Sequence, residues 1–252
     1  MSKSKTFKLP KRKLDSHKGT YGKALIVAGS SGMLGAAVLA SRGCLRCGAG
    51  LVYLAVPTEL VNYANTMTPE VIVIPLEKIS AINPDAIAIG PGLGNKTVQI
   101  PANQLVVDAD ALFNMPPNPT IITPHQGEMA RLMGKTVDEV QSNRLETAKA
   151  AAKKYNCIAV LKGNKTVVAD QVGNTYINST GNPGMATGGT GDVLTGMITA
   201  FLAQGINAWE AATFGVYLHG LAGDLAAKEK GEYSLIASDI IGQIPNVIRK
   251  YF

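Results

Sequence analysis

The chain has 252 residues, 46% of them hydrophobic, a length that suits one large α/β domain or two small ones. Its formal net charge of +6 arises within residues 1–18, where seven basic side chains accompany one acidic one, and the neutral remainder argues against nucleic-acid binding. Three cysteines, an odd number, argue against a disulfide framework, and the absence of about eighteen continuous apolar residues argues against a membrane span.

The first expected element is a basic arm over residues 1–18, either solvated or packed on a neighbouring subunit. A single domain over residues 19–252 should follow, because the strand and helix patterns alternate without interruption. The N-terminus lacks the apolar core of a signal peptide, so we expect a cytoplasmic protein.

Short apolar runs that alternate with helical patterns predict a parallel sheet covered by helices. In chain order the expected elements are a strand at 24–29, a helix at 34–48, a strand at 51–56, a short helix at 59–66, strands at 71–75, 86–90, 105–110 and 120–124, a long helix at 136–155, a strand at 157–163, a hairpin of 166–170 with 174–178, and helices at 190–204, 208–229 and 238–249. The predicted fold is a three-layer αβα sandwich with a mostly parallel central sheet and a small hairpin.

Cys44 and Cys47 form a C-x-x-C in the apolar helix at 34–48. With no second pair and no nearby histidine, they predict a buried helical pair, not a zinc or redox site.

The links at 95–104 and 113–119 are short for parallel crossovers, which need about ten to twelve residues. The strand order near residues 95–120 is therefore left open.

Polar residues follow several of the predicted strands directly. Gly90, Asp108, Asp110 and His125 should converge on one rim of the sheet, since ligands of open α/β sheets bind beyond the carboxyl ends of the strands.

The segment NPGMATGGTGDVLTG, residues 182–196, carries the clearest chemical signal. Gly188, Gly189 and Gly191 precede Asp192, and an apolar helix follows at once. Glycines let backbone N–H groups turn toward an anion, and a helix N-terminus adds its positive end, so this turn predicts a phosphate site. Asp192 could also cap the helix, but a cap does not explain the glycines. The spacing is neither that of a Rossmann motif nor that of a P-loop.

Six segments in chain order carry a family resemblance: SHKGTYG (16–22), GPGLG (90–94), DADAL (108–112), TPHQGEMARL (123–132), KGNKT (162–166) and GGTGDVLTG (188–196). Together they resemble the ADP- or ATP-dependent NAD(P)H-hydrate dehydratases, members of the ribokinase-like superfamily, over residues 16–250. The resemblance implies a ribokinase-like fold and a lyase that restores NADH or NADPH from the S epimer of its hydrate. ADP, which we favour over ATP, would be consumed with Mg²⁺, and AMP and phosphate would be released.

The resemblance also implies a set of site residues. Asp192 would be the catalytic base. The nucleotide would contact Lys162, Gly163, Asn164, Lys165, Thr166, Gly188, Gly189, Thr190 and Gly191. The hydrate would contact Ala36, Gly92, Gly94, His125 and Asp192, and Glu128 would support Mg²⁺ through water.

Plainer roles stay open for several of these residues. Lys162 and Lys165 could be solvated charges at a turn, and the small residues at 29–37 could serve helix–sheet packing. His125 could fill a core or capping role, and Glu128 could cap the helix that starts near Gln126. Asp108 and Asp110 could reach the metal or a ribose, or cap loops.

The sequence departs from the family pattern at Gln126, where the family usually has proline, and this change should affect loop stiffness more than chemistry. It also lacks the N-terminal epimerase domain of many bacterial relatives, so a separate epimerase is expected. The resemblance supports a homo-oligomer, a dimer or tetramer. Two other functions remain: a ribokinase-like kinase of a vitamin precursor alcohol, and a non-catalytic nucleotide sensor.

Overall fold

The computed structural model describes residue 9 and residues 11–100 and 104–251. Its described strands form one nine-stranded sheet in the order β3-β2-β1-β4-β5-β6-β7-β8-β9, parallel except for the last two pairings. The strands are β1 Lys23–Val27, β2 Leu51–Val56, β3 Ile72–Pro75, β4 Ala86–Ile89, β5 Gln104–Val107, β6 Ile121–Ile122, β7 Ile158–Leu161, β8 Val167–Ala169 and β9 Thr175–Ile177. The predicted mixed sheet with a terminal hairpin is confirmed.

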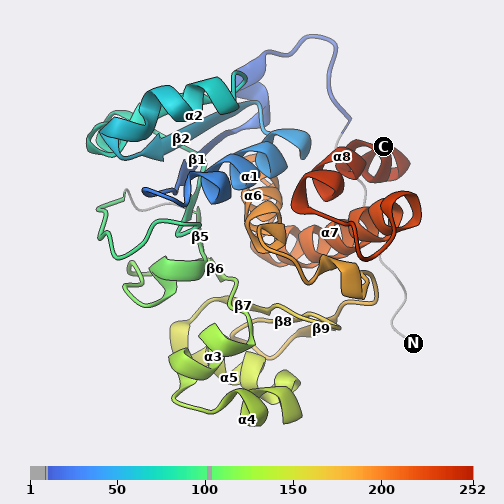
Figure 1. The fold of residues 1–252 in the computed structure, drawn as a ribbon. Coiled ribbons are helices and arrows are strands. Elements are labelled where there is room, and N and C mark those ends of the chain that lie inside the picture. The colour runs from blue at the N-terminus through green and yellow to red at the C-terminus, as the bar shows by residue number, and fades with distance from the viewer. Residues whose placement is uncertain (1–8, 10, 101–103, 252) are drawn as a thin grey trace.

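Helices cover both faces of this sheet (Figure 1). One face carries α1 Leu34–Arg46, α2 Val61–Met67, α6 Thr190–Ala203, α7 Ala208–Lys230 and α8 Ala237–Ile248, and the other carries α3 Gln126–Met133, α4 Val137–Ser142 and α5 Arg144–Tyr155. Side chains alternate along the central strands: in β1, Ile26 packs into the first layer and Leu25 into the second. The three-layer sandwich is therefore confirmed.

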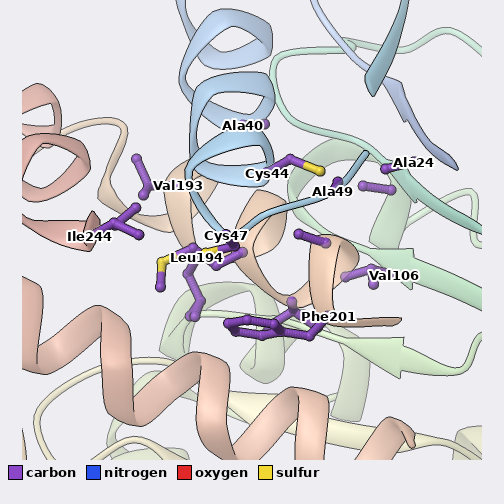
Figure 2. Close-up of a cluster of buried hydrophobic side chains, with 14 of the residues drawn as sticks. Ala24, Ala40, Cys44, Cys47, Ala49, Val106, Val193, Leu194, Phe201 and Ile244 are labelled. Atoms are coloured by element: carbon purple, nitrogen blue, oxygen red, sulfur yellow. The ribbon is translucent and has the colours of Figure 1, made fainter. Parts of the chain in front are cut away.

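Glycines bring α1 and α6 into backbone contact. A Cβ on Gly43 would lie 2.7 Å from the Val193 carbonyl oxygen, and one on Gly196 would collide with the Ala40 carbonyl. Figure 2 shows Cys44 and Cys47 among the packed side chains between these helices, both free and buried, which confirms the predicted apolar pair. This close packing, with the hydrogen bond from Thr195 to Asp108, places the first turns of α6 against α1 and at the carboxyl edge of the sheet.

The strand order near residue 100 is now settled. Strands β4 and β5 are parallel neighbours, with Ala86 paired to Gln104, and β5 and β6 are parallel neighbours, with Val106 paired to Ile121. The strands are shorter than predicted, so the links comprise residues 90–103 and 108–120, long enough for parallel crossovers.

One predicted helix is wrong. The expected helix at 136–155 is two helices, α4 and α5, separated at Asn143, whose backbone leaves the helical region at φ −141° and ψ 52°. A separate helix, α3, precedes them from Gln126, and it ends at Gly134 in the left-handed region.

The described part of the N-terminal arm packs on its own chain. Leu9 is buried and its N–H donates to the Tyr251 carbonyl at 3.3 Å. The Arg12 guanidinium lies over the Tyr21 ring at 4.2 Å and donates to the Gly48 carbonyl. Residues 1–8 and 10 lie outside the described residues, and the domain division at residue 18 stays a prediction. No helix in the described ranges is long and apolar enough to cross a membrane.

Candidate active site

The glycine turn opens directly into the first turn of α6. Gly189 is the N-cap residue, with φ 89°, and its lack of a side chain leaves the first N–H groups of the helix uncapped. A Cβ on Gly188 would meet nothing within 4 Å, so the turn borders open space. No cap hydrogen bond from a side chain is found at this helix start. The capping explanation of Asp192 is therefore not supported, and the turn keeps free N–H donors for an anion.

A buried charge cluster lies next to this turn, at the carboxyl ends of β5 and β7. The Lys162 Nζ atom is 2.6 Å from Asp108 Oδ1 and 4.0 Å from Glu128 Oε2. The other oxygen of Asp108 accepts a hydrogen bond from Thr195 Oγ1 of α6 at 2.7 Å. Asp108 is 1% exposed, so its charge is held by two partners, the largely buried Lys162 and the fully buried Thr195. We call Asp108, Lys162, Glu128 and Asp192 the charge cluster.

The surroundings of Asp192, Glu128 and Lys162 shift the pKa of each of these side chains. Burial, and next the charge of Asp108, raise the pKa of Asp192 to about 7, although Lys162 acts in the opposite direction. Burial also raises the pKa of Glu128, against the opposing charge of Lys162. For Lys162 itself burial lowers the pKa, but Asp108 and Glu128 outweigh it and the pKa is raised. Asp192 is thus a carboxylate able to exchange a proton near neutral pH.

A cavity of about 400 Å³ opens beside the charge cluster and has the size of a small-molecule site. Its walls are the β7–β8 turn (162–166), the segment after β9, the start of α6, and α7. Predicted nucleotide residues that line it are Lys162, Gly163, Asn164, Lys165, Thr166, Thr190 and Gly191. Gly188 and Gly189 are not among its lining residues; they form the turn that leads into it.

The two lysines of the β7–β8 turn differ. Lys162 turns inward to the charge cluster, and its Nζ lies 3.3 Å from where a Cβ on Gly191 would be. Lys165 is exposed, with φ 52° in the left-handed region. Thus Lys162 is not a solvated charge, whereas Lys165 faces solvent at the rim of the cavity.

The predicted hydrate residues Ala36, Gly92 and Gly94 are brought together at the start of α1. A Cβ on Gly92, whose φ is 58°, would lie 2.6 Å from the Met33 carbonyl oxygen and 3.0 Å from the Ala36 Cβ. Close helix-to-sheet packing is thus confirmed there, and contact with a ligand stays a prediction. Asp110 serves as a loop cap, because its Oδ2 accepts from the Gly94 N–H at 2.8 Å.

His125 and Glu128 cap α3 reciprocally. The His125 Nδ1 atom accepts from the N–H groups of Gly127, at 3.0 Å, and Glu128, at 3.3 Å, and Glu128 Oε2 accepts from the His125 N–H at 2.7 Å. Both capping roles are therefore confirmed. Because Nδ1 is an acceptor, the neutral His125 ring carries its proton on Nε2, which lies 3.4 Å from Glu128 Oε1 on an exposed side chain.

The charge cluster does not form a closed metal cage. No group of three or more metal-binding side chains exists in the described part of the chain. Asp108 is already occupied by Lys162 and Thr195, and one Glu128 oxygen by the helix cap. This donor set fits a Mg²⁺ ion that keeps several waters and is carried on nucleotide phosphates, with a carboxylate in support.

Sequence reasoning did not predict most of the far wall of the cavity. Asn178, Thr180, Val216 and His219 line it, together with Asn182 from the predicted segment 182–196. Burial lowers the pKa of His219 to about 4, so this side chain is neutral at physiological pH. The helical pattern of α7 did not single out Val216 or His219, because this helix is apolar around much of its circumference.

The sheet is mostly parallel and lies between two layers of helices, and a helix N-terminus that can bind an anion lies at its carboxyl edge. These features define a nucleotide-binding protein of the ribokinase-like fold. Within that class, the chain belongs to the NAD(P)H-hydrate dehydratase family, whose sequence profile matches residues 24–246.

Individual relatives agree with this family. The chain is 37% identical to the ADP-dependent (S)-NAD(P)H-hydrate dehydratase of Bacillus subtilis, over 96% of this chain and 95% of that protein. A crystal structure of the Bacillus subtilis ADP/ATP-dependent NAD(P)H-hydrate dehydratase, co-crystallised with ATP and Mg²⁺, superposes with a TM-score of 0.87 and 35% identity, covering 97% of this chain and 95% of that one. The bifunctional NAD(P)H-hydrate repair enzyme Nnr of Moorella thermoacetica is 41% identical over 96% of this chain but 52% of its own length. The chain spans about half the length of the bifunctional relatives it matches.

Proposed function

We propose that this chain is an ADP-dependent dehydratase that restores NADH and NADPH from the S epimers of their hydrates and releases AMP and phosphate. The observation that carries the proposal is Asp192, with a pKa near 7, in the first turn of α6 beside Lys162 and a nucleotide-sized cavity. The Bacillus subtilis relative of nearly the same length, which bears this activity in its name, supports it.

The nucleotide would lie in the cavity between the β7–β8 turn and the start of α6. There the free N–H groups at Gly188–Gly191 would bind its phosphates, and the Lys162 ammonium would stand beside them. The hydrate would lie on the other side of Asp192, across Ala36, Gly92, Gly94 and the Nε2–H of His125. Asp192 would then stand between the two ligands.

The chemistry needs a base for an alcohol. Asp192, when ionised, would take the proton of the ring hydroxyl as that oxygen attacks the β-phosphorus of ADP; an O–P bond forms, and the bond to the AMP oxygen breaks. Phosphate then leaves with the electron pair of the C–O bond, and the loss of a proton from the adjacent ring carbon restores the double bond. Hydroxide is a poor leaving group, and phosphorylation removes that obstacle. Lys162 and the N–H groups of the turn would stabilise charge on the transferring phosphoryl group.

Mg²⁺ would reach the site on the phosphates, with Glu128 in support through water, and would neutralise part of the phosphate charge. The protein would work as a homo-oligomer in the cytoplasm, a compartment in which three free buried cysteines stay reduced. A separate epimerase would convert the R hydrate into the S epimer.

The test is recovery of the absorbance of reduced nicotinamide from purified S hydrate. We expect recovery with ADP and Mg²⁺, together with AMP and phosphate in equal amounts. No recovery with ADP or ATP, together with ATP-dependent phosphorylation of a hydroxymethylpyrimidine or thiazole alcohol, would establish the kinase alternative instead. Nucleotide binding without either reaction would establish the sensor alternative.

A further inference from the structure

Arg144, at the first position of α5, contacts the β7–β8 turn from behind the cavity. One terminal nitrogen of its guanidinium donates to the Leu161 carbonyl at 2.9 Å and to the Lys162 carbonyl at 3.2 Å. The turn also passes very close to it, because a Cβ on Gly163, whose φ is 136°, would lie 3.2 Å from the other terminal nitrogen. None of the sequence motifs includes this arginine.

Lys162 is thereby fixed at each of its polar groups. Its N–H donates to the Pro124 carbonyl at 2.9 Å, its ammonium pairs with Asp108, and its carbonyl accepts from Arg144. The first two contacts come from the sheet edge and the third from a helix outside it. Removal of Arg144 would leave the side chain of Lys162 paired but would free the backbone of the turn that follows.

Arg144 is itself held by two glutamines. The second terminal nitrogen of Arg144 donates to Gln141 Oε1 at 2.8 Å, and Gln141 Nε2 donates to Gln126 Oε1 at 3.2 Å. Gln126 is the first residue of α3 and directly follows His125. A hydrogen-bonded bridge thus runs from the loop proposed to bind the hydrate to the turn proposed to bind the nucleotide.

We propose that Arg144 is a positioning residue for nucleotide binding, which holds the Leu161–Gly163 turn in its binding geometry, and that Gln126 and Gln141 orient its guanidinium. This inference rests on one part of the proposed function, namely that the cavity binds ADP. The break between α4 and α5 gives the bridge its geometry, since Gln141 and Arg144 lie on either side of Asn143. A planar guanidinium can hold two neighbouring carbonyls and an amide together, which the ammonium of a lysine cannot do as rigidly.

The test is calorimetric titration with ADP and Mg²⁺, which needs no turnover and so separates this inference from the proposed reaction. We expect Arg144→Met to weaken ADP binding about tenfold or more, because the Leu161–Gly163 turn loses the two hydrogen bonds from a charged group that hold it. Arg144→Lys should fall between this variant and the wild type, and Gln141→Leu should weaken binding about two- to threefold. The matched control is Lys149→Met on the same helix, where an exposed cation pairs with Glu146 at 3.0 Å, and it should bind ADP as the wild type does.

Steady-state kinetics adds a readout that a purely structural role would not give. The Arg144 variants should raise KM for ADP and leave KM for the hydrate unchanged. Gln126→Pro tests the far end of the bridge: proline is favoured at the first position of a helix, so the variant should fold and weaken ADP binding as Gln141→Leu does. The inference is overturned if Arg144→Met and Arg144→Lys lower Tm but bind ADP as tightly as the wild type. If Arg144→Met fails to fold, Arg144→Lys and Gln141→Leu decide the question. Absence of ADP binding by the wild type would count against the proposed function itself.

Discussion

Replacement of Asp108 by asparagine tests how the charge cluster sets the pKa of Asp192, the proposed catalytic base. The change keeps the shape of the side chain and removes its charge. Asp108 is 1% exposed and lies 2.6 Å from Lys162 Nζ, so the variant leaves a buried ammonium with Glu128, at 4.0 Å, as its nearest acidic partner.

The magnitude follows from this geometry. Removal of one partner of a buried ion pair costs about 3–5 kcal/mol, and the remaining Glu128 places this case toward the lower end. At about 2–4 °C per kcal/mol for a domain of this size, a cost of about 3 kcal/mol should lower Tm by about 6–12 °C. The charge of Asp108 also contributes to the raised pKa of Asp192, so that pKa should fall below 7 while burial still holds it above its ordinary 3.8.

The assay is the pH dependence of kcat for ADP-dependent recovery of reduced nicotinamide. Because Asp192 must be ionised to act as a base, kcat rises with pH through its pKa, and this acidic limb should move to lower pH in Asp108→Asn. Thr195→Val is the matched control, since it removes the other hydrogen bond to Asp108 but no charge, and its limb should stay near that of the wild type. An unchanged limb in an Asp108→Asn protein of unchanged Tm would refute the reasoning.

Three further predictions concern stability and binding. Asp192 loses its proton near pH 3.8 in the unfolded chain and near pH 7 in the folded protein, so stability falls as pH rises through this window. Asp192→Asn should therefore raise Tm more at pH 8 than at pH 5. An equal gain in Tm at both pH values would contradict this. In Gly191→Ala the added methyl lies 3.3 Å from Lys162 Nζ at the proposed phosphate site, so calorimetry should show weaker ADP binding. Tm should not fall, because alanine is a better helix former than glycine. An unaltered affinity for ADP would contradict this. Burial lowers the pKa of His219 from 6.5 to about 4, so the wild-type protein loses stability as pH falls through that range. In His219→Leu, the free energy of unfolding by denaturant should fall less between pH 7 and pH 5 than in the wild type. An equal fall in both proteins would contradict the assignment.

The sheet and the glycine turn were predictable because their signals are local. Apolar runs such as 24–29 and 51–56 can be satisfied only by strands buried on both faces, and the glycines before Asp192 have no packing explanation in the sequence. The break at Asn143 was not predictable, since neither glycine nor proline marks it and the helical pattern continues on both sides.

Several residues of the cavity wall and of the charge cluster were predictable, but their pairings were not. Asp108 was expected at the carboxyl rim of the sheet and Lys162 at the nucleotide. Their ion pair depends on the order β5-β6-β7, which the short links left undecided. His219 was not expected, because only the packing of α7 against the start of α6 brings it to the cavity. The cap formed by His125 and Glu128 was among the roles that the sequence left open, since an acidic side chain three residues after a capping residue is a known helix start.

The most direct test of the central claim compares wild type and Asp192→Asn at pH 8 in one experiment, with ADP affinity from calorimetry and single-turnover recovery of reduced nicotinamide from the S hydrate. Loss of a general base costs about 10²–10⁴-fold in rate, so turnover should fall by at least that factor while ADP still binds. Turnover by Asp192→Asn at the wild-type rate, with ADP bound, would show that another group takes the proton.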